Sequence, residues 1–295
     1  MRKIAILLVG MLGSQLLKAQ EDSVQTYKKR LTTLTSVTAI GVIGTYSALG
    51  YLWYNNQPKS NFHFFNDNHE WMQLDKMGHA LSAFAISETA VSTLRQLGMP
   101  KKKAILIGGL SGAIIQTPIE LFDGFAQSYG ASWGDEIANI TGSGLVMGQY
   151  LLWDEIRVRP KFLYHHTAFP TRTPINGLLG DHWSNYWLKD YNGQTYWLSV
   201  DLHKFILKNN QFPKWLNIAI GTGATNMKRA QIEDNIALGL SPYRRYFISL
   251  DINLSSIKSN SKFIRMCLKT INYIRIPLPT IEYNSFHGFQ GHWFY

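Results

Sequence analysis

Pairs of polar side chains recur at helical spacing within three apolar stretches of the chain. These pairs are Asp75 and His79, Gln116 and Glu120, and Asp135 and Asn139, with Asp123 and Gly142 three residues after the second and third pairs. Residues three or four apart stack on one side of a helix. If the three helices pack antiparallel, their polar stripes could converge on one pocket.

The residues of this predicted pocket have side chains suited to metal binding or to acid and base chemistry. The candidates for both roles are His79, Glu120, Asp123 and Asp135. Imidazole and carboxylate groups coordinate metal ions, and they can also donate and accept protons as a pair. Lys76 and Asn139 are candidates for binding a cofactor or ligand, because a lysine can pair with a carboxylate or a phosphate-bearing ligand. The identity of any metal or cofactor stays unknown.

Each candidate also has a structural explanation. Asp75 precedes a helical pattern and could be its N-cap. Ser132 and Asp135 have the spacing of a capping box, and Asp123 stands before a glycine that could end a helix. His79 could be a hydrogen-bonded core histidine. The shared pocket therefore requires the side chains of His79, Glu120 and Asp135 to lie within about 10 Å of one another.

Four apolar stretches supply the helices that must position these residues. They cover residues 31–54, 77–97, 104–119 and 137–153. The first has no charged side chain in its 24 residues, which is long enough for a helix to cross a bilayer. Short connections, such as residues 98–100, favour antiparallel neighbours. We therefore predict a membrane-associated antiparallel bundle of about four helices over residues 21–160, with a soluble bundle as the alternative.

Charged residues are predicted to divide between the two ends of this bundle. The basic groups at one end are Lys28, Lys29, Arg30, Arg95, Lys101, Lys102, Lys103, Arg157, Arg159 and Lys161. The acidic groups at the other end are Asp67, Glu70, Asp75, Glu120, Asp123, Asp135 and Glu136. The formal net charge of +10 and the apolar helices indicate contact with a membrane or anionic lipid. The chain has no dense basic stripe, which argues against nucleic acid, while a protein partner and the oligomeric state stay open.

The N-terminus has the order of a secretory signal. Arg2 and Lys3 precede an apolar run at residues 4–17, and small or polar residues follow as far as Gln20. Because this run is short for a membrane span, residues 1–20 are predicted to be a signal peptide and the protein to be exported. An uncleaved anchor is the alternative. Cys267 is the one cysteine, which excludes an internal disulfide and a cysteine-based zinc site.

The composition changes after Pro160, where proline, asparagine, glycine and aromatic residues become more frequent. Apolar and polar residues then alternate with a period of two over residues 196–202, 216–220 and 246–255. This alternation is typical of strands. We predict a β-containing module over residues 161–295, and hence an α+β fold for the whole chain.

The candidate residues resemble the signature of a known family. Residues 75–79 (DKMGH), 120–124 (ELFDG) and 133–142 (WGDEIANITG) contain the steps D-K-x-x-H, E-x-x-D and D-x-x-x-N-x-x-G. This signature is similar to that of the YfiM-like bacterial envelope proteins, which are often described as predicted periplasmic lipoproteins. Residues 62–67 (FHFFND) are similar to the Bacteroidetes-type version, which has a C-terminal extension. The first and third steps also resemble, distantly, those of VanZ-like membrane proteins.

This resemblance covers about residues 60–160 and implies a location in the bacterial envelope, in the periplasm at a membrane, without implying a reaction. The chain departs from the lipoprotein description because no cysteine lies near its N-terminus to carry a lipid.

Three functional hypotheses follow from these patterns. In the first, the protein is a non-enzymatic envelope protein whose polar pocket binds an ion, a lipid headgroup or a partner. In the second, it is a membrane-associated hydrolase or transferase that acts on a lipid or cell-wall precursor, with His79 as acid or base and the carboxylates as metal ligands or proton relays. In the third, the bundle is purely structural. Whether the protein is an enzyme is left open.

Overall fold

The computed structural model describes residues 24–50, 58–169, 178–180, 183–205 and 213–295. The predicted signal peptide at residues 1–20 lies outside the described residues, as does the end of the first apolar stretch at 51–54. The chain divides into two compact units. The first comprises Met1–Asp67 and His79–Glu155, and the second comprises Asn68–Gly78 and Ile156–Tyr295.

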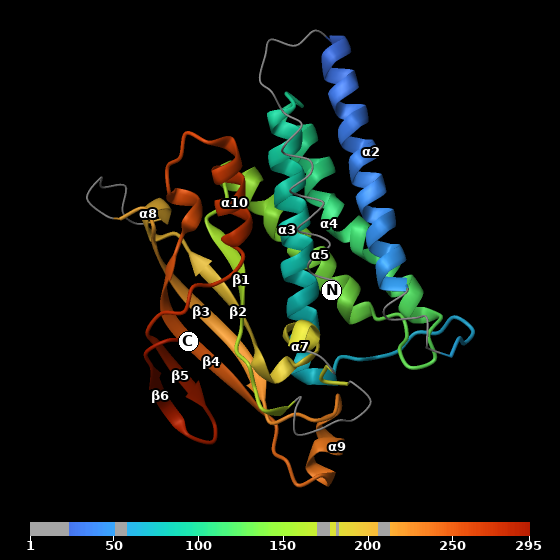
Figure 1. Cartoon of the computed structure of the whole chain (residues 1–295), viewed down its shortest axis with the longest axis vertical. Coiled ribbons are helices and arrows are strands. Elements are labelled where there is room, and N and C mark those ends of the chain that lie inside the picture. Colours follow the sequence, from blue (N-terminus) through green and yellow to red (C-terminus); the bar gives the residue numbers. More distant parts are fainter. Residues whose placement is uncertain (1–23, 51–57, 170–177, 181–182, 206–212) are drawn as a thin grey trace. The chain divides into compact units, whose positions relative to one another are not determined.

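The first unit is helical (Figure 1). Its helices are α2 (Val24–Leu49), α3 (Leu74–Gln96), α4 (Lys101–Gly124) and α5 (Trp133–Trp153). The first turn of α3 belongs to the second unit. Residues near the start of α3 meet the end of α4 and the start of α5, so α3, α4 and α5 run antiparallel in succession. This confirms the predicted bundle of about four helices.

Two glycines allow α4 and α5 to approach α3 closely. A Cβ atom on Gly112 of α4 would lie 2.1 Å from the carbonyl oxygen of Ala83, and one on Gly142 of α5 would lie 2.1 Å from that of Ala80. Both distances are far shorter than any van der Waals contact, so only glycine fits. At the opposite end, Leu94, Leu97, Met99 and Ala104 form an apolar cluster that residues of α2 help to cover.

The outer surface of the helical unit is strongly apolar. Exposed side chains on α4 and α5 include Leu106, Ile114, Ile137, Ile140 and Leu151, of which Ile114 and Leu151 are each 64% exposed. Among the described helices, α4 alone is long and apolar enough to cross a membrane. The stretch at 31–54, of which we expected this property, lies partly in α2 and partly outside the described residues, so that expectation stays a prediction.

The second unit is built on a six-stranded antiparallel sheet with the strand order β1-β2-β3-β4-β5-β6. The strands are β1 (Val158–Tyr164), β2 (Gln194–Val200), β3 (Leu216–Thr225), β4 (Tyr243–Ile252), β5 (Thr280–Asn284) and β6 (Gly288–His292). The helices in this unit are α7 (Trp183–Lys189), α8 (Leu202–Phe205), α9 (Ile232–Ala237) and α10 (Lys262–Ile271). The sheet confirms the predicted β-containing module and the α+β fold.

The sheet has one apolar exposed face and one buried face that carries polar and aromatic residues. On β4, Tyr246, Ile248 and Leu250 are exposed, whereas the intervening Phe247, Ser249 and Asp251 are buried. The exposed row continues across the sheet through the register partners Leu198, Ile220, Ile248 and Ile281. The sheet therefore reverses the usual arrangement, in which polar residues face outward.

Ion pairs and aromatic rings fill the buried face. Lys161 on β1 pairs with Asp251 on β4 at 2.7 Å, with side chains 1% and 0% exposed. This position corrects our prediction that Arg159 and Lys161 belong to the basic end of the helical bundle. Both residues lie on β1, because the strand begins at Val158, just before the proline at which we placed the boundary. Arg275 lies over the ring of Trp197, 3.8 Å from its centroid.

Candidate functional site

The predicted polar residues lie where α3 begins, α4 ends and α5 begins. His79 comes from α3, Glu120 and Asp123 from α4, and Asp135 and Asn139 from α5. All five are buried, and none of them is more than 6% exposed. Ionisable groups that are removed from water in this way need ionic or hydrogen-bonding partners.

The local structure at the start of α5 accounts for part of this arrangement. Ser132 is the N-cap of α5, and its side-chain oxygen accepts a hydrogen bond of 3.1 Å from the backbone N–H of Asp135. The backbone N–H of Ser132 donates to Oε2 of Glu120 at 3.1 Å. In a capping box, the Asp135 carboxylate would accept the hydrogen bond from the backbone N–H of Ser132, but here Glu120 accepts it. Helix capping therefore does not account for the Asp135 carboxylate.

One network of amides orients the His79 ring. Its Nδ1 atom lies 3.2 Å from Oδ1 of Asn139, which also accepts a hydrogen bond of 2.7 Å from Nε2 of Gln116. The amide nitrogen of Asn139 donates to Glu136 at 3.3 Å, which leaves Oδ1 as the acceptor that faces the ring. Nδ1 of His79 therefore carries the proton in the neutral ring, and Nε2 keeps its lone pair.

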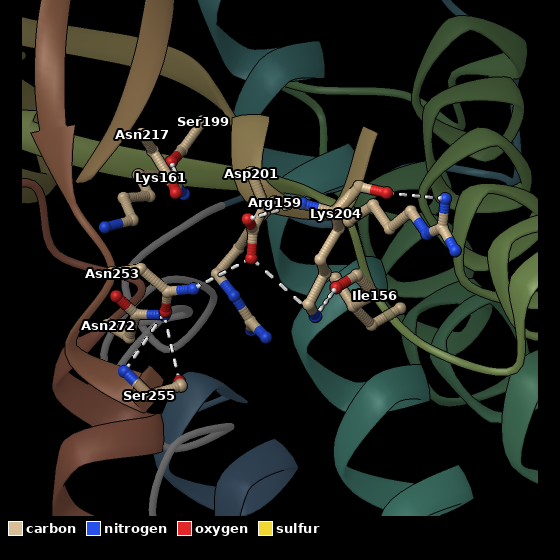
Figure 2. A pocket seen from close by; sticks show the side chains of 11 residues that line it. Ile156, Arg159, Lys161, Ser199, Asp201, Lys204, Asn217, Asn253, Ser255 and Asn272 are labelled. Carbon is tan, nitrogen blue, oxygen red and sulfur yellow. Dashed lines mark hydrogen bonds and ion pairs between the residues drawn. The ribbon is translucent and has the colours of Figure 1, made fainter. Parts of the chain in front are cut away.

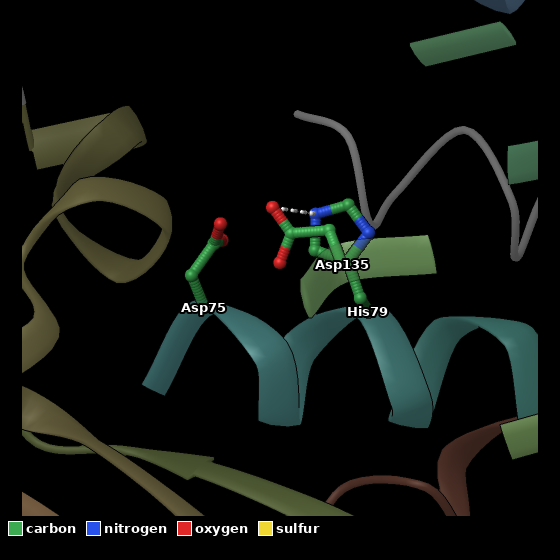
Figure 3. Close-up of side chains that lie close together, drawn as sticks. All are labelled: Asp75, His79 and Asp135. Atoms are coloured by element: carbon green, nitrogen blue, oxygen red, sulfur yellow. Dashed lines mark ion pairs between the residues drawn. The ribbon is translucent and has the colours of Figure 1, made fainter. Parts of the chain in front are cut away.

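The lone pair of His79 Nε2 faces a carboxylate. Nε2 lies 4.0 Å from Oδ2 of Asp135. Figure 3 marks this pair with a dashed line. On the other side of the ring, Nδ1 lies 3.9 Å from Oε1 of Glu120. The distance to Asp135 exceeds hydrogen-bond length. It suits two ligands of one ion, since ligand atoms about 2.0 to 2.2 Å from a metal are about 3 to 4 Å apart.

Asp75 lies one turn before His79 along α3 and belongs to the second unit. Within the second unit, the hydroxyl of Tyr191 donates to Oδ1 of Asp75 at 3.0 Å, and its ring stacks on Trp71. Asp75 is the second residue of α3 rather than its N-cap.

The structure therefore brings together most of the predicted site. His79, Glu120, Asp135 and Asn139 meet through side-chain distances of 4.0 Å or less. Asp123 is buried one turn beyond Glu120, where its carbonyl oxygen accepts a hydrogen bond from Ala126. Lys76 follows Asp75 directly and so lies on a different side of α3. The catalytic, metal-binding and cofactor-binding roles of these residues stay predictions.

One contributor was not predicted as a site residue. Glu136 was assigned only to the acidic end, yet it accepts hydrogen bonds from Asn139 and from Thr117, the latter at 2.9 Å. The spacing of three residues between Glu136 and Asn139 could have indicated this contact, because such residues lie on one side of a helix.

Comparison with known proteins gives one match. Residues 63–151, less than half of the chain, match the family model described as "Predicted periplasmic lipoprotein (DUF2279)". No curated protein and no solved structure matches the chain. The matched segment contains every predicted site residue from Asp75 to Gly142. The match supports an uncharacterised periplasmic lipoprotein family and, with it, a protein that is exported and associated with the cell envelope.

Proposed function

We propose that this protein is a membrane-associated envelope protein that binds a divalent metal ion in its helical unit. His79 and Asp135 are the central ligands, and Glu120 lies on the other side of the imidazole. The observation that carries the proposal is the orientation of the imidazole. Its Nδ1 atom is held by Asn139, and its Nε2 atom faces Asp135 at 4.0 Å.

His79 has the features of a metal-bound histidine whose ring is held by a hydrogen-bond acceptor. Metal-bound histidines almost always donate their other ring N–H to an oxygen acceptor, which fixes the tautomer and aims the lone pair. Asn139 provides that acceptor for His79. One imidazole with carboxylate oxygens suits Zn²⁺ or Mn²⁺ better than a soft metal, which prefers sulfur.

We propose that the membrane contact is made by the helical unit. Its exposed isoleucines and leucines, together with the length of α4, support insertion into lipid. Lys101, Lys102 and Lys103 at the start of α4 are exposed, which suits anionic headgroups. Alkaline carbonate washing of isolated envelopes tests this. The chain should stay in the membrane pellet, and quantitative release into the supernatant would contradict membrane insertion.

Metal binding is tested by isothermal titration of the purified full chain, stripped with a chelator, with ZnCl₂ and MnCl₂. We expect saturable binding of one ion per chain. His79→Ala should weaken binding at least 100-fold, and Asp135→Asn, which keeps the side-chain shape, should weaken it at least tenfold. His287→Ala, at an exposed histidine on the sheet unit, is the matched control and should bind as the wild type does. Equal binding by all four proteins would contradict the proposal.

The alternative function as a hydrolase or transferase on a lipid or cell-wall precursor builds on the same ion. A divalent metal beside a carboxylate could activate a water molecule for attack on an ester. This alternative requires turnover of such a substrate, whereas the binding proposal does not. The signature residues also support a narrower relationship to YfiM-like proteins and a distant one to VanZ-like proteins, which we infer from the resemblance alone.

A further inference from the structure

Helix α10 of the sheet unit keeps its apolar side chains apart from its basic ones. With 3.6 residues per turn, the large apolar side chains fall on one side of the helix, and these are Phe263, Ile264, Leu268 and Ile271. The basic side chains fall on the opposite side, and these are Lys262, Arg265 and Lys269. A helix with this division normally packs its apolar side against the core of the protein.

The described part of the chain leaves the apolar side of α10 open to solvent. None of the 10 residues of the helix is buried. Phe263 is 60% exposed, and Ile264 and Ile271 are each 48% exposed. Three large apolar side chains exposed on one side of a short helix are unfavourable in water, because their contact with water is not relieved by packing. This side of α10 is therefore expected to meet an apolar partner.

Helix α10 is fixed to the sheet unit at its C-terminal end. Asn272, the residue after the helix, is 1% exposed, and its side-chain nitrogen donates to Oδ1 of Asn253 at 3.1 Å and to Oγ of Ser255 at 3.0 Å. Figure 2 shows these three residues together in the lining of a polar cavity. The backbone N–H of Phe162 on β1 donates to the carbonyl oxygen of Tyr273 at 2.8 Å. The exposed apolar side therefore belongs to a helix that is anchored in the unit.

The segment around α10 carries positive charge only. Residues 252–281 contain five basic residues and no acidic one. Four of the five are exposed, and these are Lys258, Lys262, Arg265 and Lys269. None of these four side chains forms an ion pair with a carboxylate in the described part of the chain. Such a segment attracts an anionic surface, and it repels a second copy of itself.

We propose that α10 lies in the interface of an anionic lipid bilayer, with its apolar side among the acyl chains and its basic side at the headgroups. A basic helix with one strongly apolar side and one strongly polar side binds membranes in this way. Its 10 residues span about 15 Å, whereas a helix that crosses a bilayer needs about 20 residues, so α10 lies in the plane of the membrane. This contact adds to the membrane association proposed for the helical unit, on which it rests.

The one cysteine of the chain allows a direct test, because Cys267 lies within α10. An environment-sensitive fluorophore is attached to its thiol, and the full chain is reconstituted into nanodiscs of phosphatidylcholine alone or of equal parts phosphatidylcholine and phosphatidylglycerol. We expect a blue shift of the emission, and quenching by nitroxide lipids, in the anionic discs. The control carries the label on exposed α9, as Ile236→Cys combined with Cys267→Ser, and should emit equally in both lipids.

Removal of the positive charge tests the role of the headgroups. Lys262→Gln combined with Lys269→Gln should lower the ratio of membrane-bound to free α10 about 30-fold, at about fivefold for each lysine near an anionic surface, and the blue shift should be lost. Lys214→Gln, at an exposed lysine before β3 in the same unit, is the control and should keep the shift. Circular dichroism shows whether each labelled variant is folded.

Three outcomes overturn the proposal, and they can be told apart. A chain that does not enter either kind of disc contradicts the proposed membrane association as well. A chain that enters the discs but whose label at Cys267 emits equally in both lipids contradicts only the role of α10. A blue shift that appears without lipid and grows with protein concentration assigns the apolar side of α10 to a second copy of the chain.

Discussion

Arg245 and Glu282 form a two-point ion pair inside the sheet unit, in which Nε of Arg245 donates to Oε1 of Glu282 at 2.7 Å and Nη2 donates to Oε2. The side chain of Glu282 is 1% exposed. His292 lies 2.9 Å from the same Oε2 atom. These three residues belong to β4, β5 and β6, so one carboxylate links three adjacent strands.

Removing the charge of Glu282 should destabilise the sheet unit. Glu282→Gln leaves the guanidinium of Arg245 buried beside a neutral amide, which typically costs about 3–5 kcal/mol when one partner of a buried pair is lost. Urea unfolding followed by tryptophan fluorescence measures the change. Glu233→Gln, on the exposed side of α9, is the control and should stay within about 0.5 kcal/mol of the wild type. Equal stability of both variants would show that the pair contributes little.

The sheet unit should lose stability in mild acid through His165. Burial, together with the charges of Arg245 and Arg275, lowers the pKa of His165 from 6.5 to about 4. Because the folded state resists protonation, this contribution is complete above pH 6.5 and is lost as the pH falls from 6.5 to about 4.

Replacement of His165 by Phe tests this dependence, because Phe can keep the stacking on Tyr295, where the ring centroids are 4.0 Å apart, but cannot bind a proton. Melting temperatures across this pH window should fall less in His165→Phe than in the wild type. His166→Phe, at the exposed neighbouring position, should follow the wild-type profile. A wild-type profile in His165→Phe would assign the acid sensitivity to other groups.

The hydrogen bond between His79 and Asn139 should raise the metal affinity of the site. Asn139→Ala removes the acceptor that holds Nδ1, and loss of such support typically lowers metal affinity about 10- to 100-fold. Zinc titration of the full chain measures the change, and Thr141→Ala on the exposed side of α5 is the control. An unchanged affinity in Asn139→Ala would mean that the amide does not select the tautomer.

Two glycines of α5 should respond in opposite directions to alanine. A Cβ atom at position 142 would lie 2.1 Å from the carbonyl oxygen of Ala80, so Gly142→Ala should push α5 away from α3 and cost about 1–3 kcal/mol. Gly148 has open space at its Cβ position, and Gly148→Ala should stabilise the helix by up to about 1 kcal/mol. Thermal unfolding by circular dichroism compares them. A Gly142→Ala variant as stable as Gly148→Ala would argue against close packing.

The helical part of the fold and the meeting of the site residues could be predicted because they depend on local spacing. The apolar stretch at 77–97 became α3, and the four-residue steps at His79, Glu120 and Asp135 placed these side chains on facing sides of their helices. The orientation of the imidazole could not be predicted, because it depends on the acceptor at Asn139, which lies 60 residues away from His79.

The sheet was harder to predict for a physical reason. Alternation at residues 246–255 identified a strand, but its buried face carries Ser249 and Asp251 while its apolar residues face outward. A rule that places apolar residues in the core would therefore assign the faces incorrectly. Neither edge strand was predicted. β1 includes Pro160, and β6 has two glycines in five residues, so both have weak strand patterns.

The reversed faces of the sheet have a consequence for strand alignment. A slip of one residue between β4 and β5 would turn Glu282 toward the outer surface and bring Ile281 and Tyr283 against Arg245. Such a slip would separate an ion pair and leave a buried guanidinium among hydrocarbon groups, which is far costlier than mismatching two apolar rows. The buried ion pair between Arg245 and Glu282 therefore favours one alignment of β4 and β5 during folding.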